Sequence, residues 1–593
     1  MTTITANSTV GIILSSPSYT NPVVVNPTVT ISNYYSNGTG ISGSSDVWTI
    51  RSAGTIAGNI TSGQGVDLKY GGSVTNQSGA RISGLYGVYG GYDGALSVVN
   101  AGSITGNTTT SAGNGIHILA GGSVTNQSGG MITGFDGIFQ VASAALMVVN
   151  AGGIAGNTTA GHGIYLGVGG SVANQSGATV SGFRAIFGAA SAALMVVNAG
   201  SIAGNAMSGC GIELDGGGSV TNQSGATVSG FRGVFGGGGP MTVVNAGTIN
   251  GGSSSVHFAA GQSNRLVVEP GAMFSGPVDG GNTIGATWTT TLELAFGASA
   301  GTLSAIGTQF INFGSIAFDV GTDWFIAGNT SGLAGTITGF AQGDTIELNG
   351  IAVTGSSYAG GVLTLTEASG SATLDLPGSF TTNQFVVTNV AAGADVSLAC
   401  FRADTRIRTM RGEVPVEQLL VGDQVEVLLG GPPAPIVWVG HRTVDCKRHP
   451  VPQRVWPVRV CAGTFGPGLP LRDLFLSPDH AIFIEDVLIP IKQLINGHSI
   501  VQVPVDEVTW YHVELAQHDV LLAEGLPAES YLDTGNRGSF SNGGVPERLY
   551  PDFCECVREA HGCAPLIMTG PRVAVVRHRV GVRATAADTS VAA

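Results

Sequence analysis

The sequence predicts an all-β chain, in which a long β-helical repeat is followed by a second β-rich segment and a compact C-terminal β-domain. Two observations carry this prediction: short phrases recur at a nearly constant step through the first half, and the composition changes abruptly at residue 400. Charged residues make up only 10% of the 593, whereas 94 are glycine and 43% are hydrophobic. Disordered chains lack that hydrophobic content, so this chain must fold, with glycine supplying many turns between short strands.

The repeat is marked by asparagine. The phrase GGSVTNQSG alternates with VVNAG, and their asparagines follow one another at steps of 23 to 26 residues, with Ser52 one further step upstream. A constant step of this size indicates a solenoid, and strand-like pieces between glycines favour a β-helix with one coil per step. Nine such coils would form a rod on the order of 40 Å long, with the asparagine amides bonded from coil to coil at one corner. The asparagines are Asn76, Asn100, Asn126, Asn150, Asn174, Asn198, Asn222 and Asn245.

We assign the repeat to residues 1–250, where it is clearest from residue 45. Residues 45–250 resemble the passenger rods of bacterial autotransporters and adhesins, which implies a secreted or cell-surface protein. The rod is then either a plain stalk or a binder of a surface or matrix target. The opening residues MTTITANSTVGIILSS lack a basic region and a long apolar core, so we expect export without a Sec-type signal peptide. Triplets such as Asn107–Thr109 match glycosylation acceptors, but an Asn/Thr-rich repeat produces them by chance.

Residues 251–399 lose the strict step but keep alternating apolar and polar residues between glycines, which predicts either a second small solenoid or a sandwich.

A domain boundary follows residue 399. Six of the 24 basic residues lie before residue 400, so the other 18 fall in the last 194 residues. The net charge of −14 argues against nucleic acid as a partner. No apolar run reaches transmembrane length.

Three blocks after residue 399 carry the candidate chemistry. The first, CFRADTRIRT followed by LLVGDQVEV, starts at Cys400 and contains Asp423. The second, LSPDHAIFI, is an S-x-x-H box made by Ser477 and His480. The third, VTWYHVELAQHDVLLAEGLPAES, contains two further histidines. Together the blocks resemble a Hint (hedgehog/intein) self-processing domain over residues 400–535, closest to the bacterial Hint group that follows long secreted-type repeats.

The resemblance implies that Cys400 attacks the carbonyl of Ala399 and converts that peptide bond to a thioester. A thiol is mostly protonated near neutrality, so a base must take its proton, and the departing amide nitrogen must gain one. His480 is the candidate for this proton transfer, and Ser477 would hydrogen-bond the scissile peptide and hold it distorted. The alternatives are structural: Cys400 could be a small buried hydrophobe and His480 a core histidine.

Other candidates are divided between site and structure. For His512 and His518, the sequence favours neither a role in the site nor a role in packing. Asp423 either braces a turn or assists the nucleophile. The cysteines at 554, 556 and 563, with His561, do not match zinc spacing, so we expect no metal and no cofactor. The tail, residues 536–593, ends after Pro565 in a stretch that is basic and then small and polar, and a secretion signal is one interpretation of it.

The function that the sequence predicts is a single-turnover self-cleavage between Ala399 and Cys400, which releases or transfers the rod. The acyl acceptor is open among water, a thiol, an amine and a lipid alcohol. Splicing is not expected, because Glu529 and Ser530 stand where inteins carry His-Asn. The alternative is a secreted or surface structural protein whose Hint fold is inert.

Overall fold

The structure is a computed structural model in which the chain forms two compact units, Met1–Leu292 with Gln309–Gly314, and Glu293–Thr308 with Ser315–Ala593. About half of the chain is strand and about 4% is helix, with a solenoid of about 14 turns in the part that the structure describes. The prediction of an all-β chain is thus confirmed. The described residues are 1–141, 144–190, 192–297, 300–320, 322–341, 344–378, 385–390, 392–397, 400–429, 431–447, 452–531, 563–565, 567 and 570–591.

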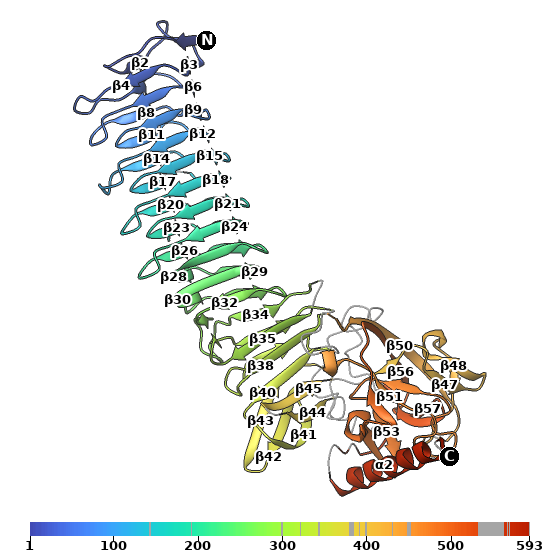
Figure 1. Cartoon of the computed structure of the whole chain (residues 1–593). Helices are drawn as coiled ribbons and strands as arrows, with labels where there is room; N and C mark the ends of the chain where they lie inside the picture. The colour runs from blue at the N-terminus through green and yellow to red at the C-terminus, as the bar shows by residue number, and fades with distance from the viewer. Residues whose placement is uncertain are drawn as a thin grey trace. The chain divides into compact units, whose positions relative to one another are not determined.

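The first unit is a solenoid of stacked coils. Each coil is built from three short strands that pair in parallel with the equivalent strands of the neighbouring coils (Figure 1). The first row is β1 (Thr2–Ile4), β3 (Val23–Val25), β6 (Trp48–Ser52), β9 (Gly72–Asn76), β12 (Leu96–Asn100), β15 (Gly122–Asn126), β18 (Leu146–Asn150), β21 (Gly170–Asn174), β24 (Leu194–Asn198), β27 (Gly218–Asn222), β29 (Met241–Asn245) and β31 (Arg265–Val268). The second is β4 (Thr30–Ser32), β7 (Thr55–Ala57), β10 (Arg81–Ser83), β13 (Ser103–Thr105), β16 (Met131–Thr133), β19 (Gly153–Ala155), β22 (Thr179–Ser181), β25 (Ser201–Ala203) and β32 (Met273–Ser275). The third is β2 (Ile12–Leu14), β5 (Ile41–Gly43), β8 (Gln64–Leu68), β11 (Tyr86–Gly90), β14 (Asn114–Ile118), β17 (Asp136–Gln140), β20 (His162–Leu166), β23 (Arg184–Gly188), β26 (Cys210–Leu214), β33 (Val278–Asp279) and β36 (Phe310–Ile311), while β28 (Thr227–Gly236) and β30 (Thr248–His257) span the last two rows.

The predicted asparagine ladder is present at the end of the first row. Each side-chain amide donates to the side-chain oxygen of the next asparagine, for example Asn126 to Asn150 at 2.8 Å and Asn150 to Asn174 at 2.9 Å. The same amide also donates to a backbone carbonyl one coil further on, as Asn150 does to Thr179 at 3.0 Å. Because buried amides need partners, this ladder fixes the register of successive coils. Inside it, aliphatic side chains such as Val148 are fully buried.

Coils also form outside the part of the repeat that the asparagines mark. Strands β1 to β5 stack ahead of residue 45, within the residues 1–250 assigned to the rod but before its repeated phrases begin. The glycosylation triplet at Asn107 has a structural role, because its side-chain oxygen accepts the Thr109 N–H at 2.8 Å and its amide donates to the Ile60 carbonyl.

The second unit begins with more parallel strands and then changes to antiparallel pairing. Strand β38 lies between β35 and β40, and β37 pairs with β39. An antiparallel meander and a hairpin follow. The segment is therefore a continuation of solenoid pairing that ends in hairpins. These strands are β35 (Gly301–Ile306), β37 (Ser315–Phe318), β38 (Trp324–Gly328), β39 (Thr336–Thr338), β40 (Thr345–Asn349), β41 (Val353–Ala359), β42 (Val362–Glu367), β43 (Gly370–Asp375), β44 (Val386–Val390) and β45 (Gly393–Ser397).

From residue 400 the chain forms a separate, mostly antiparallel sheet around its own apolar core. Its elements are β46 (Phe401–Arg402), β47 (Arg406–Thr409), β48 (Gly412–Pro415), η2 (Val416–Gln418), β49 (Gln424–Val425), β50 (Ala434–Asp445), η3 (Pro452–Arg454), β51 (Val458–Val460), β52 (Leu474–Leu476), β53 (Ala481–Ile484), β54 (Val487–Pro490), η4 (Ile491–Leu494), β55 (Ile500–Gln502), β56 (Glu507–Leu515), β57 (Val520–Ala523) and β58 (Leu526–Glu529). The helix α2 (Pro571–Val591) adds Val573, Val576 and Val580 to the same core. The sequence did not predict this helix.

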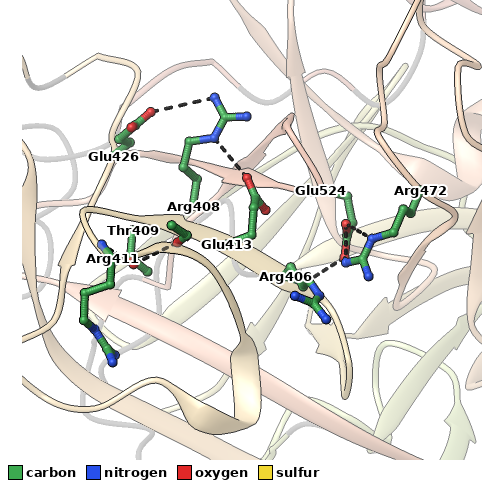
Figure 2. A network of polar contacts seen from close by, with 9 residues as sticks. Arg406, Arg408, Thr409, Arg411, Glu413, Glu426, Arg472 and Glu524 are labelled. Atoms are coloured by element: carbon green, nitrogen blue, oxygen red, sulfur yellow. Dashed lines mark hydrogen bonds and ion pairs between the residues drawn. The ribbon is translucent and has the colours of Figure 1, made fainter.

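A network of ion pairs fastens the β47–β48 hairpin (Figure 2). Arg408 bonds Glu413 at 3.0 Å within the hairpin. Glu524, at the turn between β57 and β58, accepts the backbone N–H of Arg406 at 2.8 Å and binds the Arg472 guanidinium through both carboxylate oxygens. Since Glu524 is buried, this charge-assisted contact fixes the start of β47, a few residues after Cys400.

Candidate functional site

Cys400 lies immediately before β46 and is completely buried. Strand β46 pairs with β56, with Phe401 opposite Tyr511, so antiparallel register brings Cys400 next to His512. The Cys400 Sγ lies 2.8 Å from Nε2 of His512. The thiol otherwise packs in an apolar cluster with Trp510 and Val444. A thiol and an imidazole, groups of the kinds that serve as nucleophile and base in proteins, are therefore in direct contact where the sulfur has no exposed surface.

Ser477 holds the peptide group on the nitrogen side of Cys400. The backbone N–H of Cys400 donates to Ser477 Oγ at 2.6 Å, and the Ser477 N–H donates to the Cys400 carbonyl at 2.9 Å. The Cys400 nitrogen belongs to the Ala399–Cys400 peptide bond, the bond predicted to break. The expected contact between Ser477 and the scissile peptide is therefore present, although Ala399 itself lies outside the described residues.

His480 lies beside the backbone of Cys400 rather than at its sulfur. Its ring packs on Phe401 with centroids 4.0 Å apart. Among the described residues, neither ring nitrogen has a hydrogen-bond partner of good geometry. Burial lowers the pKa of His480 to about 4, although the nearby backbone groups of Cys400 and Glu529 act in the opposite direction. The ring is thus neutral at pH 7 and, once protonated, a stronger acid than an ordinary imidazolium beside the Cys400 backbone.

The histidine at the sulfur is His512, which the sequence left equally divided between site and structure. Its ring also packs against Tyr531, with centroids 4.8 Å apart. The signal that could have singled it out is its place on a long strand, in the sequence TWYHVEL, where it shares a face with Trp510. What the sequence does not show is the pairing of β46 with β56 across more than 100 residues.

Comparison with known proteins gives a match over the residues that contain this site. A family model described as the Hint domain matches residues 399–535. The C-terminal region of this chain is a Hint domain. The family is known for autoprocessing. No curated protein matches the chain.

Two other predicted residues of the Hint domain lie in structural settings. His518 is buried, and its Nε2 lies 3.0 Å from the Ser530 carbonyl oxygen, while its Nδ1 accepts the Cys563 N–H at 3.3 Å. Asp423 forms an ion pair with Arg411 and accepts the Leu420 N–H at 3.1 Å. These contacts match one of the two roles considered for Asp423, in which its carboxylate braces a turn.

The electrostatics around Cys400 keep its thiol protonated. Burial raises the pKa of the Cys400 thiol well above its ordinary value; the positive charge of Arg442 opposes this rise and the carboxylate of Asp479 adds to it. Asp479 itself pairs with Lys492. A buried thiolate is costly to form in advance, so the proton must leave as the sulfur attacks.

The described residues contain no group of three or more His, Cys, Asp or Glu side chains that could hold a metal ion. Cys554, Cys556 and His561 lie outside those residues, so the prediction for that cluster stays a prediction. In the part of the chain that the structure describes, no helix combines the length and apolar character needed to span a bilayer.

Proposed function

We propose that the Hint domain cleaves its own chain between Ala399 and Cys400 through an N-to-S acyl shift, and so releases or transfers the N-terminal solenoid. One observation carries this proposal: Cys400 contacts a base through its sulfur and a hydroxyl through its backbone nitrogen. The sulfur lies 2.8 Å from His512, and the nitrogen lies 2.6 Å from Ser477 Oγ. A structural cysteine would need neither contact.

The acyl shift divides proton transfer between two histidines. His512 takes the proton from Sγ as the sulfur attacks the Ala399 carbonyl carbon, and a C–S bond forms. The C–N bond then breaks, and the Cys400 nitrogen leaves as an amine after gaining a proton from the protonated form of His480, which takes that proton from solvent before the step. The Sγ proton stays on His512 until it returns to solvent. Ser477 holds that nitrogen in place throughout, by accepting its N–H. The products of this step are a thioester on Cys400 and a free amino group on the same residue.

The thioester is then open to an acceptor of one of four classes: water, a thiol, an amine or a lipid alcohol. Attack on the thioester carbonyl frees the Cys400 thiol and leaves residues 1–399 as an acid or as an adduct of the acceptor. Because the site acts once on its own chain, the reaction is a single turnover. The chemical class of the acceptor is what distinguishes release of the solenoid from its transfer.

We infer that the domain does not splice. Splicing needs an asparagine side-chain nitrogen to cut a second bond. At that position Ser530 accepts the Asp519 N–H through its Oγ at 3.0 Å, and serine has no amide to cyclise. The residue before it, Glu529, uses its carboxylate to accept the Ala481 N–H at 3.0 Å. Asn536, the next asparagine, lies outside the described residues.

The test is a denaturing gel and intact mass spectrometry of the full chain. We expect fragments 1–399 and 400–593, and an uncleaved chain for Cys400→Ala. The matched control is Cys461→Ala, which removes a free cysteine elsewhere in the domain and should cleave normally. The mass of the first fragment identifies the acceptor. A wild-type chain that stays intact with and without added thiol would support the inert alternative, and cleavage of Cys400→Ala at the same bond would contradict the mechanism.

A further inference from the structure

Arg442 is a buried cation on the strand face that carries the nucleophile. It lies on β50 with only 5% of its surface exposed. Along the β50–β56 pairing, Gly440 is opposite His512 and Arg442 is opposite Trp510. Since every second residue of a strand shares a face, Arg442 points to the side of the sheet where His512 meets Cys400. A side chain at Gly440 is excluded there, because its Cβ would lie 2.0 Å from the Trp438 ring.

The groups that hold this guanidinium come from outside the Hint match. Arg442 donates to the carboxylate of Asp323 and to the carbonyl of Thr322, which directly precede β38 and belong to the same compact unit. A second carboxylate, Asp344, is buried next to them and accepts the Trp324 N–H at 2.9 Å. Its charge is coupled electrostatically to Arg442. The segment at the end of the solenoid thus supplies the counter-ions for a cation of the processing domain.

One donor of the guanidinium is unused. Among the described residues, Nη1 of Arg442 is buried without a hydrogen-bond partner. Buried donors are nearly always paired, so an unpaired guanidinium nitrogen on the nucleophile's face is a feature to explain. Negative charge develops on that face when the Cys400 thiol loses its proton. A fixed positive donor stabilises such charge strongly where water is excluded.

We propose that Arg442 is a positioning residue that stabilises negative charge at Cys400 only while Asp323 holds its guanidinium, so that self-cleavage depends on the folding of the segment before β38. The inference rests on the proposed self-cleavage. Arg442 transfers no proton: the Sγ proton passes to His512, and the arginine charge lowers the energy of the thiolate and of the tetrahedral oxyanion. A chain whose solenoid end has not folded lacks the carboxylate and carbonyl that hold the guanidinium in place, so the positive charge is no longer fixed beside Cys400 and the nucleophile stays protonated.

The test compares cleavage rates across pH for full-length precursors diluted out of urea. Arg442→Gln and Asp323→Asn should each slow cleavage by about 10- to 100-fold and move its pH profile upward. The double variant should be no slower than Arg442→Gln, because both changes remove one coupled unit. Arg411→Gln, which breaks the exposed Arg411–Asp423 pair of the same domain, is the matched control and should cleave normally. Additive losses, or a normal rate and pH profile for Arg442→Gln, would overturn the proposal.

Two further measurements guard against trivial outcomes. If Arg442→Gln fails to fold, the paired change Asp323→Leu with Arg442→Met removes both charges together, which buried sites often tolerate. That folded variant should cleave slowly, and wild-type cleavage would contradict the proposal. If no variant cleaves, the thiolate absorbance of the chain minus that of Cys400→Ser reports the thiol directly. The Cys400 thiolate should appear at higher pH in Arg442→Gln than in the wild type. The other titratable groups that face the thiol, His512, His480 and Asp479, are present in both chains, so an unchanged Cys400 titration would refute the inference.

Discussion

Replacing His512 with alanine should slow cleavage before Cys400 by at least about 100-fold, within the range of 10²–10⁴ for the loss of a general base. The magnitude follows from the site. A thiol of ordinary pKa, about 8.5, is ionised in roughly 3% of molecules at pH 7, and burial raises the pKa of Cys400 well above that value. Without the imidazole 2.8 Å from Sγ, the proton has no nearby acceptor in the apolar cluster.

The assay follows loss of the full-length band after dilution from urea at a series of pH values. The rate of His512→Ala should rise about tenfold per pH unit until the thiol itself ionises, whereas the wild-type rate should depend less steeply on pH because His512 takes the proton. His441→Ala is the control, because His441 lies on the neighbouring strand β50, faces the other side of the sheet and stacks on Tyr511. Equal rates and pH profiles for His512→Ala and the wild type would show that His512 is only a packing residue.

Three further predictions concern the site and the rod. Ser477→Ala should slow cleavage by about 10- to 100-fold by freeing the scissile N–H, whereas Ser477→Thr should retain most activity. Equal cleavage rates for Ser477→Ala and the wild type, measured on a denaturing gel, would contradict this. Asn150→Ala should destabilise its coils by about 2–5 kcal/mol through unpaired buried amides, seen as lost hydrogen-exchange protection, while exposed Met147→Ala should not. The pKa of His480 is lowered to about 4 in the folded chain, so the unfolded chain takes up this proton first as the pH falls from 6.5 to 4. The free energy of unfolding should therefore drop by about 3 kcal/mol across that window. His480→Gln should lack this drop.

The solenoid was predictable because its structural unit is also its sequence unit. One asparagine per coil recurs in the chain, and stacking turns that linear spacing into the ladder from Asn76 to Asn245. The coils before residue 45 carry no such asparagine, so the sequence assigned these residues to the rod without a repeated phrase to mark each coil. Helix α2 was missed for a different reason. Its buried positions, Val573, Val576 and Val580, are β-branched residues of modest helix propensity, and contacts with the Hint core override that preference.

The site was predictable only where a motif is local. Cys400 begins its block, and the S-x-x-H spacing places Ser477 and His480 on one turn, so both fall beside the Cys400 backbone. The partner of the sulfur depends on which strand pairs with β46. Nothing within residues 400–410 specifies β56, so His512 could be named but not placed. Arg442 was missed because its role depends on Asp323, a residue outside the processing domain altogether.

The complete burial of Cys400 imposes opposite requirements on the two halves of the proposed reaction. The acyl shift is intramolecular, so it needs no entrance, and exclusion of water strengthens every charge interaction that assists it. Resolution of the thioester needs an acceptor to reach the thioester carbonyl carbon. That carbon is bonded to the Cys400 sulfur, which has no exposed surface. The local structure around the thioester must therefore open, or the acceptor must be small enough to enter between Trp510 and Val444. Because a thioester is more reactive than the amide that it replaces, the opening step rather than the attack should limit the rate of release. Residues of the apolar cluster around the thiol would then control how fast the solenoid leaves, without taking part in the chemistry.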